Sequence, residues 1–213
     1  MPSTRYQKIN AHHYRHIWVV GDIHGEYQLL QSRLHQLSFF PEIDLLISVG
    51  DNIDRGPESL DVLRLLNQPW FTSVKGNHEA MALEAFETGD GNMWLASGGD
   101  WFFDLNDSEQ QEAIDLLLKF HHLPHIIEIT NDNIKYAIAH ADYPGSEYLF
   151  GKEIAESELL WPVDRVQKSL NGELQQINGA DYFIFGHMMF DNIQTFANQI
   201  YIDTGSPNSG RLS

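Results

Sequence analysis

The sequence predicts an α/β fold built on a mostly parallel sheet. Short apolar runs alternate with segments whose apolar residues recur at helical spacing, and each early apolar run ends at or near a glycine followed by polar residues. A chain of 213 residues is long enough to bury a full hydrophobic core. Because no internal repeat, low-complexity tract or linker divides the chain, we expect one domain over residues 1–213.

The first half of the chain alternates strands and helices. Apolar runs predict buried strands over Ile17–Val20, Leu45–Val49 and Trp70–Val74. Apolar residues at helical spacing predict three helices, marked by Tyr27, Leu30, Leu34 and Leu37, by Leu60, Leu63 and Leu66 after Pro57, and by the segment His78–Phe86. A helix between two strands brings the chain back to the starting edge, so this order implies parallel strands.

The second half has a different pattern. Glycine-rich turns at residues 89–92 and 98–100 precede an amphipathic helix over Ser108–Phe120. From His125 onward, apolar runs predict short strands over Ile126–Ile129, Ile134–Ala139, Tyr182–Phe185, Ile193–Phe196 and Ile200–Ile202. The segment Tyr143–Lys152 is expected to be an exposed loop.

Composition and charge exclude several classes of protein. With 13 Lys and Arg against 30 Asp and Glu, the net charge is −17, which repels a polyphosphate backbone and argues against a nucleic-acid partner. The absence of cysteine excludes disulfides, Cys-ligated zinc, Fe–S clusters and cysteine-dependent phosphatases. Residues Met1–Asn10 lack the apolar run of a signal peptide, and no run approaches the ~20 residues of a membrane helix. We therefore expect a cytoplasmic protein with no membrane partner.

Polar residues follow five of the predicted strands. They are Asp22-Ile23-His24, Asp51-Asn52-Ile53-Asp54-Arg55, Asn77-His78-Glu79, His140 and His187. Each segment alone is weak support, because an Asp-x-His pair is often part of a turn. Open α/β sheets bind ligands beyond the carboxyl ends of their strands, so the ordered set, with glycine or alanine beside each segment, predicts one site.

The residue types in these segments indicate metal binding. Carboxylate, imidazole and amide groups without thiolate suit Mn²⁺, Fe or Zn²⁺ better than Ca²⁺ or Cu. The number of candidate ligands exceeds what one ion uses, so we expect two metal ions.

In this order, the five segments resemble the signature of the metallophosphoesterase superfamily, specifically its phosphoprotein phosphatase branch. From Tyr6 to its end, the chain is similar to the bacterial and phage (lambda-type) serine/threonine phosphatases. The resemblance implies a calcineurin-like fold, which is a β-sandwich flanked by helices, and two Mn²⁺ ions per chain. It also implies phosphorylated proteins as substrates, with phosphoserine and phosphothreonine hydrolysed and phosphotyrosine left open.

The resemblance further implies a role for each site residue. Six residues would bind the metal ions: Asp22 and His24 the first, Asp51 both, and Asn77, His140 and His187 the second. A hydroxide bridging the ions would attack phosphorus in line, with His78 as the general acid, oriented by Asp54, and Arg55 binding the phosphate oxygens. Elementary chemistry agrees, because the serine alkoxide is a poor leaving group that needs a proton donor, and a guanidinium binds phosphate with two parallel hydrogen bonds.

Two departures from the family pattern concern phosphate binding. Lys75 stands where relatives usually carry an arginine, so it offers a point charge in place of a planar fork. Relatives also have an arginine two residues beyond the tryptophan that is Trp161 here, where this chain has Val163. Either Arg165 reaches the phosphate instead, or the phosphate is held less well.

Two other functions stay open. One is a dinucleoside tetraphosphate hydrolase or phosphodiesterase of the same superfamily. The phosphodiesterases usually have a metal-binding histidine where this chain has Met189, and the dinucleotide hydrolases usually lack the equivalents of His24 and Asp54. The other is a phosphopeptide-binding module without activity, which is supported only by Val163 and the altered stretch Ser206-Pro207-Asn208.

Several nearby residues allow a structural interpretation. Glu79 could hydrogen-bond to the site or simply begin its helix, and we favour the helix. Asp142 could support the site or be a loop charge. We expect the tryptophans Trp18, Trp70, Trp94 and Trp101 in the core, and the histidines His12, His13, His16 and His35 on the surface.

Overall fold

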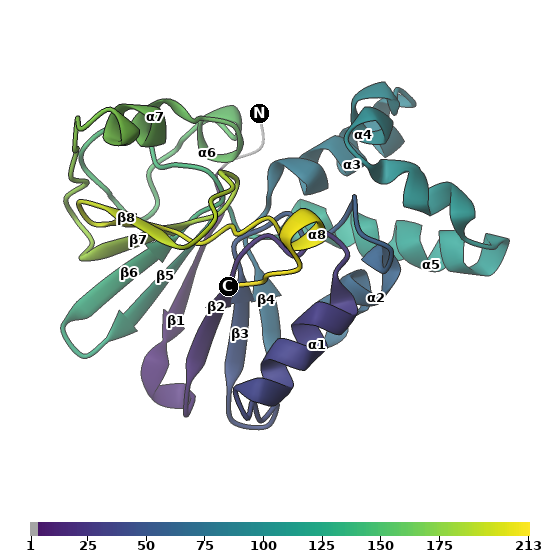
Figure 1. Ribbon diagram of the computed structural model, residues 1–213, viewed down its shortest axis with the longest axis horizontal. Coiled ribbons are helices and arrows are strands. Elements are labelled where there is room, and N and C mark those ends of the chain that lie inside the picture. The colour runs from purple at the N-terminus through teal and green to yellow at the C-terminus, as the bar shows by residue number, and fades with distance from the viewer. Residues whose placement is uncertain (1–3) are drawn as a thin grey trace.

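The computed structural model describes residues 4–213 and contains two β-sheets with helices on their outer sides (Figure 1). Residues 1–3, which the predicted domain includes, lie outside the described residues. The smaller sheet has the strand order β2-β3-β4, and the larger sheet has the order β1-β5-β6-β7-β9-β8. The division into one domain stays a prediction.

The smaller sheet confirms the parallel arrangement predicted for the first half. Its strands are β2 (Ile17–Val20), β3 (Leu45–Ser48) and β4 (Phe71–Ser73), and both neighbouring pairs are parallel. The connecting helices are α1 (Tyr27–Gln36) and α2 (Ser59–Arg64). Leu30 and Leu34 of α1 pack against Leu46, so α1 covers the outer face of this sheet (Figure 1).

The larger sheet is mixed. Its strands are β1 (Tyr6–Asn10), β5 (Ile126–Asn131), β6 (Ile134–Ile138), β7 (Tyr182–Phe185), β8 (Gln194–Phe196) and β9 (Gln199–Tyr201). Pairs β5–β6 and β8–β9 are antiparallel, and the other pairs are parallel. Strand β1 is not among the predicted strands, because this edge strand buries only Ile9 and therefore has no apolar run.

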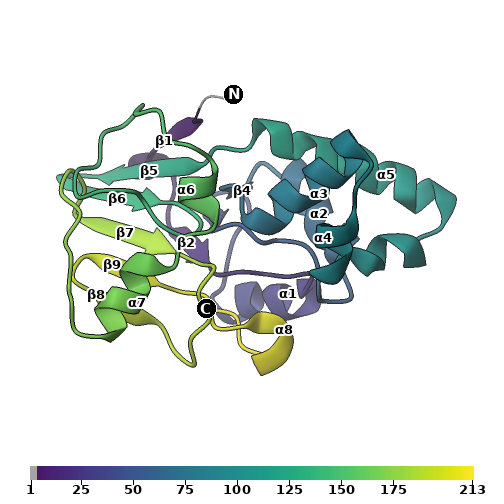
Figure 2. The same cartoon turned by 90° about the horizontal axis from the view of Figure 1, so that it is seen from above.

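The remaining α-helices lie in three places. Helices α3 (Asn77–Thr88), α4 (Asn92–Ala96) and α5 (Asp107–Leu117) gather on one side of the molecule, as the view from above shows (Figure 2). The short helices α6 (Ser157–Leu160) and α7 (Asp164–Leu170) lie by the larger sheet, and α8 (Ser206–Ser209) lies near the C-terminus. Helix α5 begins at Asn106, whose side chain accepts hydrogen bonds from the backbone N–H groups of Ser108 and Glu109.

The two sheets pack face to face, because residues of both form one buried cluster. It contains Ile47 of β3, Val49 directly after β3, and Ile127 and Ile138 of the larger sheet. Their neighbour Leu46 points the other way, toward α1, as the pleat of a strand requires. The structure is therefore a β-sandwich flanked by helices, which confirms the expected fold.

The prediction that Tyr143–Lys152 is an exposed loop is wrong for two residues. Tyr143 and Tyr148 are buried, and their rings lie 5.1 Å apart. Both rings also pack against Phe183 of β7. The segment has no regular apolar spacing, so its two tyrosines gave no sign that they cover the larger sheet.

Over residues 4–213, none of the helices combines the length and the apolar character that crossing a bilayer requires.

Replacing Ile47 by alanine tests the packing of the two sheets. Ile47 is fully buried between them, so we expect Ile47→Ala to lower the free energy of unfolding by about 2–5 kcal/mol. The control Ile43→Ala changes a residue that is 46% exposed and should alter stability by no more than about 0.5 kcal/mol. Urea denaturation measures both, and equal effects would contradict the packing described.

Candidate metal centre

The predicted metal ligands meet where the strands of both sheets end. Asp22 and His24 follow β2, Asp51 follows β3, Asn77 begins α3 after β4, His140 follows β6, and His187 follows β7. All are buried except His187, which is half-buried. The His187 backbone N–H lies 3.1 and 3.2 Å from the two carboxylate oxygens of Asp22, and Asn77 Oδ1 lies 2.8 Å from His140 Nε2 and 3.0 Å from His187 Nδ1. The structure thus brings all six residues together.

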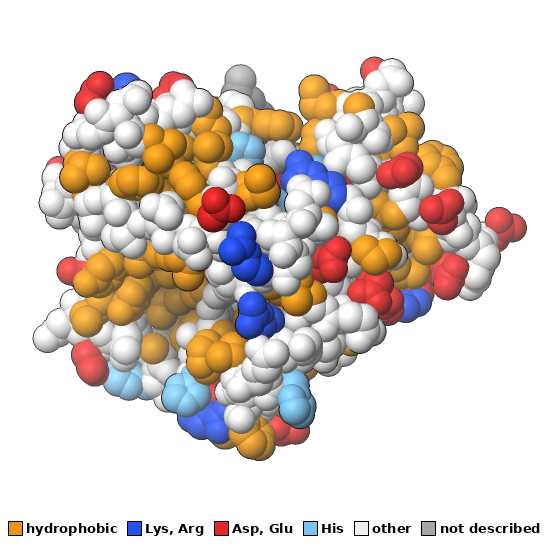
Figure 3. Space-filling view, viewed as in Figure 1, with side chains coloured by type: hydrophobic (Ala, Val, Ile, Leu, Met, Phe, Trp, Pro, Cys, Tyr) orange, Lys and Arg blue, Asp and Glu red, His pale blue; other side chains and the backbone are white. Residues whose placement is uncertain are grey.

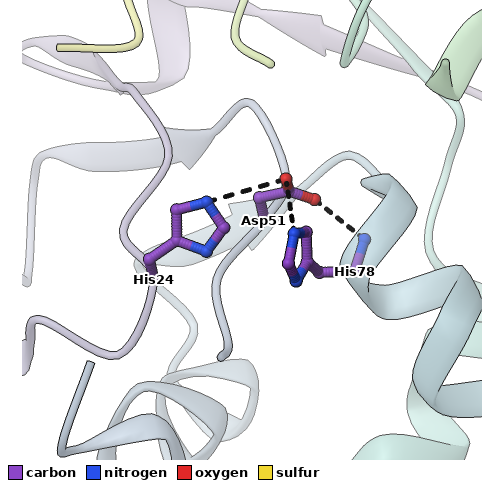
Figure 4. A group of neighbouring side chains, drawn as sticks. All are labelled: His24, Asp51 and His78. Atoms are coloured by element: carbon purple, nitrogen blue, oxygen red, sulfur yellow. Dashed lines mark hydrogen bonds and ion pairs between the residues drawn. The ribbon is translucent and has the colours of Figure 1, made fainter. Parts of the chain in front are cut away.

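Asp51 lies at the centre of this site. Its Oδ2 atom faces the rings of both His24 and His78 (Figure 4) and lies 3.8 Å from the Nε2 atom of each. Its Oδ1 atom is 3.4 Å from His140 Nε2. Two groups of donor atoms share this carboxylate, and within each group the atoms lie within 4.8 Å of one another. The first group is His24, Asp51 and His78; the second is Asp51, His140 and His187. One oxygen therefore faces each group, as a carboxylate that bridges two cations would.

Backbone carbonyls orient two of the histidine rings toward the site. Nδ1 of His24 is 2.9 Å from the carbonyl oxygen of Ile53, and Nδ1 of His140 is 2.8 Å from that of Val49. A ring that donates its Nδ1 proton to a carbonyl presents the lone pair of Nε2, which is the atom that binds a metal. The donor set therefore fits a divalent cation.

Burial and buried carboxylates control the charges in this site. Burial lowers the pKa of His24 to about 3 and that of His187 to about 4, so both rings are neutral and can bind a cation. Burial also lowers the pKa of His140, but Asp51 raises it more, to about 10. A cation that binds at His140 consequently displaces a proton.

Two glycines allow this close approach of backbone and carboxylate. A Cβ atom at Gly76 would lie 2.3 Å from Asp51 Oδ1, and one at Gly186 would lie 2.1 Å from Asp22 Oδ1. Any side chain at these positions would push a carboxylate out of place.

Five site residues other than glycine have a left-handed backbone: His24 (φ 47°), Asp51 (φ 50°), Asp54 (φ 74°), Arg55 (φ 71°) and His187 (φ 64°). Such residues cost about 1–3 kcal/mol each and persist only where the surroundings fix them. Asp54 is fixed in part by its backbone N–H, which donates to Ser59 Oγ at 3.0 Å. This concentration of strain in the predicted site is typical of a functional centre.

Glu79 does more than begin its helix, so the interpretation that we favoured is incomplete. Its fully buried carboxylate accepts the backbone N–H of Gly76 at 2.8 Å, which is part of the cap of α3. It also accepts the N–H groups of Asp51 at 2.9 Å and Asn52 at 2.7 Å. Glu79 therefore ties the loop after β3 to the loop after β4 and holds the central carboxylate in place.

His78 and Arg55 lie on the open side of Asp51. Nδ1 of His78 is 2.7 Å from Oδ2 of the fully buried Asp54. The exposed Arg55 has Nη1 at 2.8 Å from His24 Nε2 and Nη2 at 2.9 Å from His78 Nε2. The guanidinium thus lies across the mouth of the site.

Asp54 has two further partners that the sequence did not predict. Trp94 and Trp101 are buried, as expected, but their indole N–H groups donate to the Asp54 carboxylate. A buried indole N–H needs a hydrogen-bond acceptor, so the expected burial of these tryptophans already indicated that each would have such a partner. Trp18 and Trp70 are half-buried, and His12, His13, His16 and His35 are exposed.

Lys75 and Arg165 have other partners in this structure. Lys75 Nζ is 3.0 Å from Glu156, which also lies 3.0 Å from His125 Nε2. Arg165 donates from Nε to Asp142 at 2.8 Å and from Nη2 to the carbonyl oxygens of Tyr143 and Gly145 at 2.9 and 2.7 Å. Asp142 thus anchors Arg165, and a contact of Lys75 or Arg165 with phosphate stays a prediction.

The chain matches the calcineurin-like phosphoesterase family over residues 15–190. It therefore belongs to this family, in agreement with the fold and with the shared carboxylate at Asp51.

Within the family, the similarity is high to two curated proteins of Salmonella typhimurium strain LT2. The chain is 60% identical to serine/threonine-protein phosphatase 2 over all of its 213 residues and 98% of the relative. It is 44% identical to serine/threonine-protein phosphatase 1 over 212 residues, which cover 96% of that relative. A solved structure named as a candidate diadenosine tetraphosphatase has the same fold, with a TM-score of 0.73 at 24% identity over 99% of this chain and 92% of the other.

Replacing Gly186 by alanine tests the position of Asp22. Because the new Cβ would displace the Asp22 carboxylate, we expect Gly186→Ala to weaken the binding of a divalent cation by roughly 10–100-fold. Isothermal titration of the metal-stripped protein measures the change. The control Gly91→Ala adds a methyl group whose nearest neighbour is 3.7 Å away, and its affinity should equal that of the unchanged protein. Full affinity in Gly186→Ala would show that Asp22 is not a metal ligand.

Proposed function

We propose that this protein is a phosphoprotein phosphatase that hydrolyses phosphoserine and phosphothreonine and uses two Mn²⁺ ions. The observation that carries the proposal is the position of His78, which is hydrogen-bonded to a buried carboxylate and lies beside the carboxylate that two ligand groups share. The two Salmonella relatives, whose names give them a serine/threonine phosphatase activity, support the substrate class.

Six residues would hold the two ions. Asp22 and His24 would bind the first, Asp51 would serve both, and Asn77, His140 and His187 would bind the second. The absence of thiolate from this set and its mixture of carboxylate, imidazole and amide support Mn²⁺. When bound, a pair of divalent cations supplies the activated water and the positive charge that attack on a phosphate dianion requires.

His78 supplies the proton that the leaving group needs. Burial lowers its pKa, but the carboxylates of Asp51 and Asp54 raise it more, so the pKa of His78 lies above the usual value for histidine. Because Nδ1 is engaged with Asp54, Nε2 is the nitrogen that would carry the proton to the substrate once Arg55, which donates to it here, turns to the phosphate. As the P–O bond breaks, this proton passes to the serine oxygen, so that an alcohol leaves instead of an alkoxide.

Arg55 binds the phosphate group. Its guanidinium already lies within 2.9 Å of two histidine rings that face Asp51, so two of its N–H groups point at the reaction centre. Figure 3 shows Lys and Arg side chains toward the middle of this face of the molecule, although the chain as a whole carries a charge of −17. The guanidinium of Arg55 supplies local positive charge at the site, and such charge attracts a phosphate dianion. Lys75 and Arg165 would join it only by leaving Glu156 and Asp142.

Phosphate release from a phosphoserine peptide tests the proposed function. We expect no turnover by metal-stripped protein and full turnover after Mn²⁺ is added, because no side chain of the site alone activates water sufficiently. Diadenosine tetraphosphate serves as the competing substrate. Faster hydrolysis of the dinucleotide, or binding of the peptide without turnover in saturating Mn²⁺, would contradict the proposal.

Arg55→Lys tests the phosphate contact. A lysine keeps the charge but loses the planar fork, so we expect the KM for the phosphopeptide and the inhibition constant of inorganic phosphate to rise by about tenfold. The control Arg64→Lys changes an arginine that pairs with Asp61 and Glu112 on the surface, and both constants should stay unchanged. Equal constants for Arg55→Lys and the unchanged protein would exclude Arg55 as the phosphate ligand.

A further inference from the structure

We propose that Trp94 and Trp101 are positioning residues of the reaction, which act by fixing the Asp54 carboxylate and, through it, the ring of His78. This inference rests on the proposed role of His78 as the proton donor. It assigns a function to two side chains that otherwise belong to the hydrophobic core.

The Asp54 carboxylate is surrounded by three donors. Trp101 Nε1 donates to Oδ1 at 2.8 Å, and Trp94 Nε1 lies 2.9 Å from Oδ1 and 3.1 Å from Oδ2. His78 Nδ1 lies 2.7 Å from Oδ2. Because Asp54 is fully buried, these groups replace the water that an exposed carboxylate would bind.

The chemistry of indole suits this task. An indole N–H only donates and carries no charge, so it satisfies carboxylate lone pairs without competing with His78 for the role of cation. The ring is rigid and has only two side-chain torsions, so its N–H keeps one direction. A carboxylate held on both oxygens cannot rotate, and the imidazole that is bonded to it keeps its Nε2 aimed at the reaction centre.

The segment that carries both tryptophans is shaped around this contact. A Cβ atom at Gly99 would lie 2.6 Å from the Trp94 ring, so only glycine lets the chain pass there. The carbonyl of Gly98 accepts the backbone N–H of Arg55 at 3.1 Å. The two indoles pack edge to face, with ring centres 6.2 Å apart. The same segment therefore holds both Asp54 and the neighbouring Arg55.

Trp18 shows that packing alone does not produce such a contact. Trp18 belongs to β2 of the smaller sheet, and its ring is half-buried among apolar side chains. Its buried indole nitrogen has no hydrogen-bond partner among the described residues. Trp18→Phe is accordingly a matched control, since it removes an indole N–H that bonds to nothing in the described part of the chain.

The test compares two substrates whose leaving groups differ in their need for a proton. Serine needs one, whereas the nitrophenolate released from p-nitrophenyl phosphate does not. We expect Trp94→Phe and Trp101→Phe to lower kcat for the phosphoserine peptide by about tenfold each, with kcat for p-nitrophenyl phosphate within about twofold and both KM values unchanged. In an Asp54→Asn background the same changes should add no further loss, because they act through Asp54.

A second readout does not depend on activity. In the ¹⁵N-labelled protein, the indole N–H signals of Trp94 and Trp101 are identified by their loss in the two Phe variants. We expect Asp54→Asn to shift both signals upfield and to leave the Trp18 signal in place.

The outcomes separate this inference from the proposed function. If the unchanged protein with Mn²⁺ hydrolyses neither substrate, the proposed function fails and the inference fails with it. A different outcome is that the unchanged protein is active while both Phe variants lower kcat equally for the two substrates, or lower it for neither substrate. In that case the tryptophans are packing residues, and only the inference is overturned. The inference would also be overturned if the indole N–H signals of Trp94 and Trp101 did not shift in Asp54→Asn.

Discussion

Negative charge is concentrated at the edge where the two sheets meet, and the rest of the site is arranged around it. Asp22, Asp51, Glu79 and Asp203 are all buried there, and burial together with mutual repulsion raises the pKa of Asp22 and Asp203 above the usual range. Acidic groups crowded in this way are stable only with cations or hydrogen-bond donors between them. His140, the backbone N–H groups of His78 and His187, and the proposed metal ions meet this requirement. This surplus of negative charge is the reason why the site favours a divalent cation.

Backbone contacts offset the unfavourable free energy of this arrangement. Several loop residues are held in left-handed conformations that are unfavourable for side chains other than glycine. Glu79 holds the loops after β3 and β4 together by accepting three backbone N–H groups, and the glycines at 76 and 186 let carboxylates approach the chain closely. The packed sheets below provide a rigid base, so the strain in the loops does not relax.

The helices beyond the sheets contribute to the site in different ways. Helix α3 begins with Asn77 and His78, so its first turn lies in the site itself. The segment that includes α4 reaches Asp54 and Arg55 from the outside, through indole and carbonyl groups. On the other side, Arg165 of α7 and Asp142 fasten the loop that follows His140, and the Trp161 ring packs against the His187 ring. The site is therefore supported from both halves of the molecule.

The parallel strands, the connecting helices and the positions of the candidate ligands could be predicted from the amino-acid sequence alone. Apolar periodicity and glycines beside polar residues are local signals, and parallel strands bring their carboxyl ends to one edge whatever the details of packing. The edge strand β1 escaped detection because it buries a single apolar residue. The hydrogen-bond partners of the longer side chains, in contrast, depend on tertiary packing. Glu79 bonds to a loop that lies 27 and 28 residues away in the chain, Trp94 and Trp101 donate to Asp54 over 40 and 47 residues, and Arg165 is engaged with Asp142. Such contacts depend on how elements that are distant in sequence pack against one another, and the spacing of residues along the chain carries no record of that packing.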